Sequence, residues 1–392
     1  MKKSIFLLLI FILSFFVFSV SQTTKPAKAQ TEVKSEIEKE IDENLNDLIP
    51  DDLNQYFNTI EENFGFSFKE FVRGIIDGKI QISAESILQI FLDGIKRGIK
   101  ETFLSLIGVL VLCILSAISK NITAGLKKEG IDNLIYFSIY GAIICTLIVI
   151  ISDLVRSVTS TIQSINSIMD YIFPILVTLL TAIGGTSGVS FLQPITIVIS
   201  NVVIKMILNV IIPIFYASLV FTFVGNLSDA IKLERFHKTL KSIANWILGI
   251  VFSIITTFVT IQGLVGASID TITIKSAKFA LSTYVPILGG YLAEGFDIVM
   301  ASCVLIKNAL GLTAFVILLA VLMTPIVKVL LVSLSLKIIS SFVEPLGETK
   351  VASLLFDTAS NLKILIASIA GVSFLVFILL SLVIGAFNGG VV

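Results

Sequence analysis

The sequence predicts an all-α protein: a polytopic membrane bundle of about eight spanning helices, preceded by a small exported N-terminal segment of amphipathic helices. Hydrophobic residues make up 55% of the 392-residue chain and charged residues only 14%. A soluble protein of this length could not bury so much apolar surface, since charged residues usually approach a quarter of a chain. Several apolar runs also approach the roughly 20 residues that a helix needs to cross a bilayer.

The first residues have the pattern of an export signal. Lys2 and Lys3 precede an apolar run from Ile5 to Phe18, and Ala27 and Ala29 stand where a signal peptidase requires small residues. We therefore predict a signal peptide over residues 1–29. The alternative is an uncleaved N-terminal anchor.

Residues 30–101 form the predicted exported acidic helical segment. Residues 31–101 contain 16 of the chain's 28 acidic residues but only 8 basic ones. Apolar side chains recur at helical spacing from Val33 to Ile49, Pro50 ends that helix, and a second begins after Asp52. A third amphipathic run, Ile87 to Ile99, leads to the membrane. The segment is either a cap that packs on itself or a docking surface for another protein. Its acidity argues against binding to nucleic acid or anionic lipid.

Residues 102–392 form the predicted transmembrane helical domain. Two runs are ambiguous: residues 286–306 contain Glu294 and Asp297, and residues 327–343 contain Lys328 and Lys337. The latter helix could lie flat or pack against the bundle. The clearest runs are residues 102–119, 134–152, 171–183, 191–204, 206–224, 244–263, 309–326 and 364–386.

The loops predict the orientation of these spans. Lys120, Lys127 and Lys128 follow the first span, and a second basic loop lies between Lys232 and Lys241. Cytoplasmic loops are enriched in lysine and arginine, so both loops should lie inside, as an exported first segment also requires. Arg156 then lies in a predicted outside loop. The side of the C-terminus is not fixed by this argument.

One candidate functional site is the polar group Asn201, Lys205 and Asn209, whose four-residue spacing places it on one helical face. A lysine within the membrane is costly unless it meets a partner or water. The alternative is that Lys205 lies in a tight turn between two spans and extends to the interface.

A second candidate site lies between Tyr284 and Gly311. Paired glycines permit close helix approach or a break, and two carboxylates three residues apart share a face beside the membrane. If the segment spans, these groups indicate a polar pathway; if it is a re-entrant hairpin, they reach water. The candidate residues are Gly289, Gly290, Glu294, Asp297, Lys307 and Asn308.

No catalytic, cofactor-binding or metal-binding pattern is present in the sequence. Phosphate-binding, zinc-protease and nucleophile-elbow motifs are missing. The three cysteines are far apart and His237 is the single histidine, so zinc and haem attachment are disfavoured. We therefore expect no enzyme activity and no cofactor.

Three stretches carry a resemblance to a known family. They are Leu48 to Phe57, Tyr284 to Gly311, and Phe342-Val-Glu-Pro-Leu-Gly-Glu followed by Leu354-Leu-Phe-Asp. With these stretches, the chain resembles the stage III sporulation protein AE family of endospore-forming bacteria. The resemblance implies a subunit of the secretion-like channel that joins mother cell and forespore, located in the mother-cell-derived outer forespore membrane. It also implies partners: sister membrane subunits, and a forespore membrane protein across the intermembrane space.

Two functions remain as hypotheses. The first is the conduit-forming or structural membrane subunit that the resemblance implies, required for late forespore gene expression. The second is a stand-alone transporter of a small molecule, which should show a pair of broken helices in related halves. The sequence contains scattered prolines without that pairing.

Overall fold

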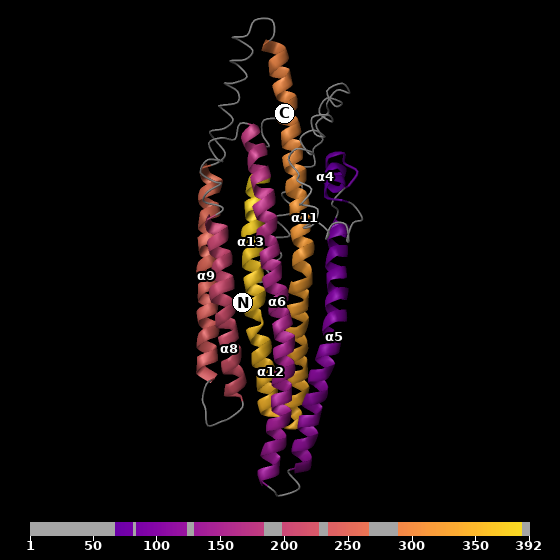
Figure 1. The fold of residues 1–392 in the computed structure, drawn as a ribbon, viewed down its shortest axis with the longest axis vertical. Coiled ribbons are helices and arrows are strands. Elements are labelled where there is room, and N and C mark those ends of the chain that lie inside the picture. The colour runs from indigo at the N-terminus through magenta and orange to yellow at the C-terminus, as the bar shows by residue number, and fades with distance from the viewer. Residues whose placement is uncertain are drawn as a thin grey trace.

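The computed structural model is a bundle of long helices. It describes residues 67–80, 84–123, 129–183, 198–226, 234–265 and 289–385, and the described residues contain helices, turns and no strands. Within these ranges, five helices are long and apolar enough to cross a membrane, together with a shorter apolar helix at Leu106–Asn121. The helices run roughly parallel or antiparallel along one axis (Figure 1). The predicted all-helical membrane fold is therefore confirmed for this part of the chain.

Several predicted spans are joined into single helices. Helix α6 runs Glu129–Ala182 and includes both the 134–152 and the 171–183 runs. The predicted outside loop around Arg156 is wrong, because residues 153–170 continue the helix. Apolar side chains recur there every three or four residues, as at Val158, Ile162 and Ile165, and all three are fully buried. An amphipathic stretch of this kind is stable as helix when its apolar face is packed.

Helix α11 is another fusion of predicted elements. It runs Gly289–Val343 and contains the 286–306 run from residue 289 onward, the 309–326 run and the 327–343 run. Pro325 lies inside it without ending it. Of the two alternatives for residues 327–343, packing against the bundle is the one that the structure has: they continue α11, and Val329, Val332 and Leu336 are fully buried. Within the described residues, α11 contacts α4, α5, α6, α12 and α13 and is the centre of the bundle.

The 191–204 and 206–224 runs are likewise joined into one helical segment where they are described. A single helical segment extends over Val198–Gly225. It consists of a helical stretch to Met206, the π-helix η2 at Ile207–Ile211 and helix α8 at Ile212–Gly225. Helix α9, Glu234–Val265, returns beside it. The five membrane-capable helices thus replace most of the about eight separate spans that the sequence predicts.

Helix α5 crosses the predicted boundary between the exported segment and the membrane domain. It runs Ala84–Thr123, so the predicted boundary after residue 101 falls inside one helix. The short helix α4, Phe68–Ile76, precedes it and packs on α11 through Phe68 and Phe71, which are buried. Ser67 and Glu70 form a reciprocal capping box that starts α4. The predicted helices between residues 33 and 60 lie outside the described residues.

The last described part of the chain consists of a helical turn and two consecutive helices. The 3₁₀-helix η3, Glu344–Leu346, follows α11 and leads to α12, Thr349–Asn361, and α13, Lys363–Gly385. Helices α5 and α6, α8 and α9, and α11 and α12 meet at the same end of the bundle (Figure 1). The described helix ends that flank the two basic loops predicted to be cytoplasmic therefore lie at one end. Joining the 134–152 run to the 171–183 run, and the 191–204 run to the 206–224 run, removes two of the predicted membrane crossings. The side predicted for the basic loops is therefore unchanged. Helix α13 ends at the opposite end of the bundle (Figure 1).

Candidate functional site

The polar group Asn201, Lys205 and Asn209 lies on the Val198–Gly225 helix, as its spacing predicts. Lys205 and Asn209 are exposed and Asn201 is half-buried. The predicted alternative, a tight turn at Lys205 between two spans, is not what the structure has, because the helix continues through this residue. Lys205 directly precedes the apolar run 206–224, so its ammonium group is exposed at one end of that run.

Asn209 lies inside the π-helical turn η2. Pro213 follows four residues later, near the start of α8. Proline has no N–H and its ring clashes with the carbonyl four residues earlier, which here is that of Asn209. A single π-helical turn widens the backbone at this point and accommodates the proline, and such turns are frequent at functional positions. The π-helical turn thus lies on the same helix as the exposed polar residues Lys205 and Asn209 and includes Asn209.

Gly289, Gly290, Glu294 and Asp297 all lie in the first turns of α11. The backbone is helical through this stretch, so Glu294 and Asp297 remain three residues apart on one helix, as predicted. A re-entrant hairpin turn is not present from residue 289 onward. The side-chain contacts of Glu294 and Asp297 and the surroundings of the two glycines lie outside the described part of the structure.

Lys307 is completely buried, and its Nζ donates a hydrogen bond to the Ile384 carbonyl oxygen at 3.2 Å. Ile384 lies in the last turn of α13, whose final carbonyls have no helical partner. A cation at a helix C-terminus is favoured by these carbonyls and by the helix dipole. Lys307 therefore caps α13, a structural role that the sequence did not indicate. Its neighbour Asn308 is half-buried.

Gly311 makes this arrangement possible. A Cβ atom at Gly311 would lie 2.3 Å from Cγ1 of Ile384, which is closer than two carbon atoms can approach. Helices α11 and α13 thus approach each other closely one turn from Lys307. The predicted close approach at the paired glycines Gly289 and Gly290 stays a prediction, because their surroundings lie outside the described residues.

A hydrogen-bonded polar cluster joins three helices in the interior. Asn361 donates from Nδ2 to the Thr222 hydroxyl at 2.9 Å, and its Oδ1 accepts from Ser218 at 3.3 Å. Ser218 lies within 3.4 Å of the His237 carbonyl oxygen. Asn361, Thr222 and Ser218 are fully buried, and Asn361 is the last residue of α12. Sequence reasoning missed this cluster; the four-residue spacing of Ser218 and Thr222 is the signal that could have indicated it.

The two lysines that made residues 327–343 ambiguous have partners in the bundle. Lys328 on α11 forms an ion pair with Asp153 on α6, with 2.7 Å between Nζ and Oδ2. Lys337 lies 5.9 Å above the centre of the Phe356 ring, within the range of a cation–π contact. These contacts explain how a helix with two lysines packs inside the bundle.

The stretch Phe342 to Glu348 is the turn between α11 and α12. Gly347 has a φ of +92°, a left-handed conformation that glycine adopts without steric cost. Lys120, at the end of α5, donates to the Gly347 carbonyl, and its Nζ lies 4.0 Å from Oε2 of Glu348. Glu348 is only 1% exposed, and burial raises the pKa of its carboxyl group, while Lys120 and a hydrogen bond from Ser116 oppose that shift. This turn therefore ties α5 to the α11–α12 junction.

Gly94 and Gly98 form a contact that sequence reasoning also missed. A Cβ at Gly94 would lie 3.1 Å from Cβ of Met323, and one at Gly98 would lie 3.1 Å from Cγ1 of Val327. Two glycines four residues apart let α5 approach α11 closely, as in the small-residue motifs of membrane helices. The sequence pattern Gly-x-x-x-Gly was the available signal.

Among the described residues, no group of three or more histidine, cysteine, aspartate or glutamate side chains could hold a metal ion. Cys113 and Cys303 are buried and Cys145 is exposed, and all three are free thiols. The chemistry that this structure carries is therefore that of buried cations, amides and hydroxyls that connect helices.

Comparison with known proteins gives two matches. The family model of stage III sporulation protein AE matches residues 66–387. The chain is also 23% identical, over 342 residues, to stage III sporulation protein AE of Bacillus subtilis (strain 168), and the match covers 86% of each chain. No solved structure matches significantly.

Proposed function

Since this chain belongs to the stage III sporulation protein AE family, we propose that it is a membrane subunit of a secretion-like channel complex that joins the mother cell to the forespore. In this proposal it resides in the outer forespore membrane, which derives from the mother cell, and supports late gene expression in the forespore. Its partners are other membrane subunits of the same complex and a forespore membrane protein across the intermembrane space. It acts without enzyme activity, cofactor or nucleic acid.

The length of the central helices is the observation that supports this proposal best. Helices α6 and α11 contain 54 and 55 residues. At about 1.5 Å per residue each is roughly 80 Å long, whereas the hydrocarbon core of a bilayer is about 30 Å thick. The bundle therefore extends well beyond one bilayer, which suits a subunit that contacts other proteins outside the membrane.

The predicted exported segment favours the same role. The acidic residues that precede residue 102 are on the predicted outer side, which during engulfment corresponds to the intermembrane space. Helix α4 anchors part of this segment on α11 through the buried Phe68 and Phe71. An acidic segment exported on this side would be a suitable contact for a partner in the opposite membrane.

A compartment-specific complementation experiment tests the proposed location. In a strain that lacks the chain, it would be expressed only in the mother cell or only in the forespore, with a late forespore reporter as readout. We expect rescue from the mother cell alone. Rescue from the forespore alone would contradict the proposed location, and failure of a tagged chain to co-purify with other membrane subunits would contradict the complex.

The alternative function is a stand-alone small-molecule transporter. One observation favours it: the helix irregularities at η2 and at Leu362 lie on packed neighbours, with the polar cluster of Asn361 and Thr222 beside the second one. However, both ends of the Asn361 amide are already used in contacts between helices. Solute uptake by the purified chain alone in proteoliposomes would favour this alternative.

A further inference from the structure

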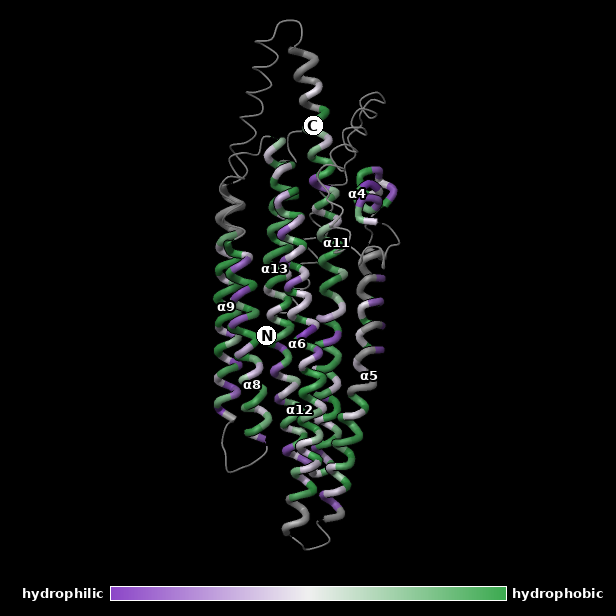
Figure 2. The backbone as a smooth tube through the Cα atoms, in the orientation of Figure 1, coloured by the Kyte–Doolittle hydropathy of each residue, from purple (hydrophilic) through white to green (hydrophobic). Residues whose placement is uncertain are grey.

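Three lysines from three helices converge at the junction between α12 and α13. They are Lys241 on α9, Lys337 on α11 and Lys363, the first residue of α13. Lys241 lies within electrostatic range of the other two lysines and of Asp357 on α12. The hydropathy colouring shows hydrophilic positions among the mostly hydrophobic residues of α9 and α12 (Figure 2). Within this group, three positive charges therefore meet one carboxylate.

Two buried hydrogen bonds set the position of Lys337 along α12. Ser340 and Ser333 of α11 donate, at 2.7 and 2.9 Å, to two α12 carbonyls that flank Phe356 in the sequence. Lys337 lies between these two serines on α11, and its Nζ is 5.9 Å from the centre of the Phe356 ring. The contact between α11 and α12 therefore holds Lys337 beside the outer face of α12.

The buried polar cluster sets the position of Lys241. The Ser218 hydroxyl lies 3.4 Å from the His237 carbonyl oxygen on α9 and 3.3 Å from Oδ1 of Asn361 on α12. Lys241 follows the buried His237 by four residues and thus lies on the same, packed face of α9. Lys363 follows Asn361 by two residues. Lys241 and Lys363 are therefore brought to the same level by contacts that do not involve either lysine.

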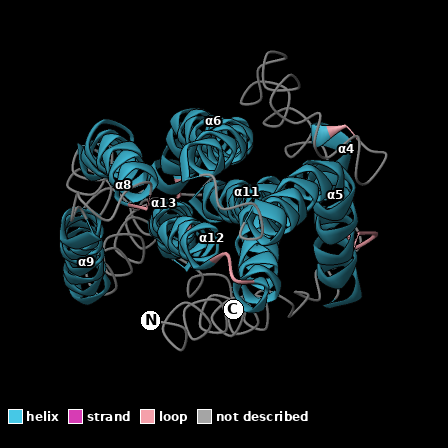
Figure 3. Ribbon diagram, turned by 90° about the horizontal axis from the view of Figure 1, so that it is seen from below, coloured by secondary structure: helices cyan, strands magenta, loops and turns pink. Residues whose placement is uncertain are grey.

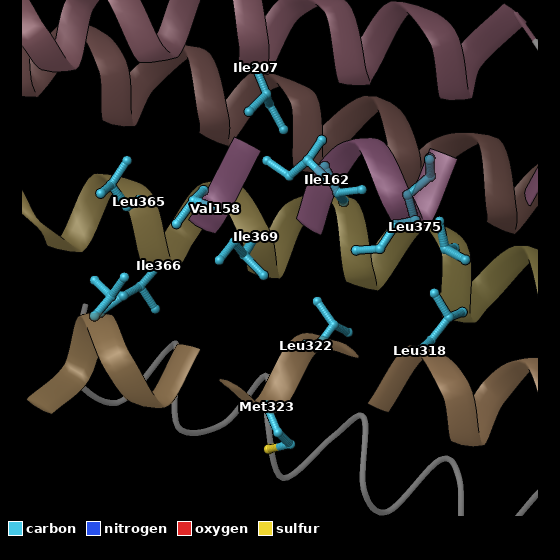
Figure 4. Close-up of a cluster of buried hydrophobic side chains, with 14 of the residues drawn as sticks. Val158, Ile162, Ile207, Leu318, Leu322, Met323, Leu365, Ile366, Ile369 and Leu375 are labelled. Atoms are coloured by element: carbon cyan, nitrogen blue, oxygen red, sulfur yellow. The ribbon is translucent and has the colours of Figure 1, made fainter. Parts of the chain in front are cut away.

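The first turns of α13 are anchored in the core. Leu365, Ile366 and Ile369 lie in the same buried cluster as Val158 and Ile162 of α6 (Figure 4). Seen along the bundle, α12 lies between α9 and α11 (Figure 3). The three lysines therefore belong to a fixed framework of packed helices.

The outer face of α12 between these lysines is accessible and mostly polar. Ser353 is exposed, Phe356 is 52% exposed, and Asp357 and Ser360 are half-buried. Their spacing places them on one side of the helix. We call the α12 face the set Ser353, Phe356, Asp357 and Ser360.

The chemistry of this surface favours a protein helix that carries carboxylates. The excess of lysine attracts anionic groups, and the lysines come from different helices, so carboxylates spaced along one partner helix could each meet one of them. Serine side chains at an interface let helices approach closely and form hydrogen bonds across it. The exposed Phe356 ring offers an apolar contact of the kind that anchors protein interfaces. A lipid phosphate would use the charge but neither the serines nor the ring.

We propose that the α12 face, together with Lys241, Lys337 and Lys363, is the docking site for an acidic helix of another membrane subunit, whose carboxylates pair with these lysines. Such pairing is favourable at any depth, because charged side chains within a membrane also need a partner. This inference rests on the proposed function as a subunit of a complex. It adds which surface of the chain binds a partner and which chemistry that partner carries.

Photocrosslinking in sporulating cells tests the proposal. The photoreactive residue p-benzoylphenylalanine would replace Ser353 on the α12 face and, as a matched control, Val149, which is 70% exposed on α6. Both positions are exposed, so the substitutions leave the packing and all charged groups of the site in place. After irradiation, the tagged chain would be purified and its crosslinked products identified by mass spectrometry.

We expect position 353 to crosslink to a segment of another membrane subunit that contains aspartate or glutamate, and position 149 not to reach that segment. Crosslinks from position 353 to phospholipid alone, to this chain itself or to a segment without carboxylates would overturn the proposal. So would the absence of any crosslinked product, because the face would then be open to solvent.

Charge reversal gives a second measurement. Lys363→Glu should lower the amount of the co-purified partner about tenfold or more, because like charges would then face each other. Lys96→Glu, at a lysine that is 78% exposed on α5, makes the same change of charge elsewhere and should leave co-purification unchanged. A compensating change of the crosslinked carboxylate to lysine should restore binding to Lys363→Glu, which a merely structural defect would not allow. Unchanged co-purification of Lys363→Glu would overturn the proposal, and if this variant fails to accumulate, the crosslinking result decides.

The two measurements separate this inference from the proposed function. If position 353 crosslinks to an acidic membrane segment but complementation succeeds only from the forespore, the proposed location fails while the docking site remains. If other membrane subunits co-purify equally with the wild type and with Lys363→Glu, the complex remains and the docking site is refuted.

Discussion

Lys120, at the end of α5, lies 4.0 Å from Glu348, the residue before α12, measured from Nζ to Oε2. The two residues are far apart in the sequence, and Glu348 is almost completely buried. Lys120 also donates to the carbonyl of Gly347, the left-handed glycine of the same turn. This lysine therefore holds the α11–α12 turn against α5 at the end of the bundle where the predicted cytoplasmic loops lie.

The first prediction concerns the pH dependence of this junction. Because burial raises the pKa of Glu348 above 4.5, the folded protein binds more protons than the unfolded chain between 4.5 and the raised value. The free energy of unfolding should therefore fall as pH rises through that window. Thermal unfolding in detergent at a series of pH values would measure this slope. The slope should be smaller in Glu348→Gln; an equal slope in the variant would assign it to other groups.

The second prediction concerns the α5–α11 contact. Gly98→Leu should destabilise the protein by about 1–3 kcal/mol, because the new side chain would overlap Val327 and Leu331. Gly108→Leu is the matched control, since Gly108 is exposed on the same helix and a Cβ there meets nothing within 4 Å. Thermal unfolding of both variants would compare them. Equal melting temperatures would show that the close approach of the two helices is not needed.

The third prediction concerns the role of Lys307. Lys307→Met should lower stability by only about 1 kcal/mol, because it removes one hydrogen bond to Ile384 but keeps the buried volume. Spore yield should remain near the wild-type level if the lysine only caps α13. Lys307→Glu should prevent accumulation, because a carboxylate would face the helix carbonyls. A stable Lys307→Met protein that forms no spores would instead assign the lysine to transport.

The fourth prediction concerns the buried amide. Asn361→Ala should destabilise the protein by about 1–3 kcal/mol, because Thr222 and Ser218 would lose their partner in a dry interior. Combining it with Thr222→Val should cost less than the sum of the two single substitutions, since residues in one network are coupled. A double-mutant cycle measured by thermal unfolding gives the coupling. Additive losses would contradict a shared hydrogen bond.

The fifth prediction concerns the exposed face around η2. Lys205→Leu should reduce spore yield without lowering the amount of protein, because an exposed side chain leaves no cavity when it is replaced. Val202→Leu, one turn earlier and 56% exposed, is the control and should sporulate normally. Spore counts and immunoblots would measure both. Normal spore yield from Lys205→Leu would remove this lysine from the candidate site.

The sequence by itself determined the class of the protein and which parts are helix. Apolar composition requires a membrane or an extensive core, and spacings such as that of Lys205 and Asn209 place residues on one helical face without knowledge of the fold. The basic loops also predict a sidedness, which stays a prediction; the described helix ends that flank these loops lie at one end of the bundle. These properties are local or compositional, so no tertiary contact is needed to predict them.

Only the tertiary structure decided where apolar runs join and what their polar residues contact. Hydropathy alone predicts a polar loop at residues 153–170. Because the apolar face of this stretch is buried against other helices, α6 continues through it. Lys307 is a candidate functional residue by sequence, and its partner is a carbonyl of α13 that is 77 residues away. Gly94 and Gly98 matter because Met323 and Val327 happen to face them. Burial and pairing between distant segments depend on packing, which a pattern along one segment does not contain.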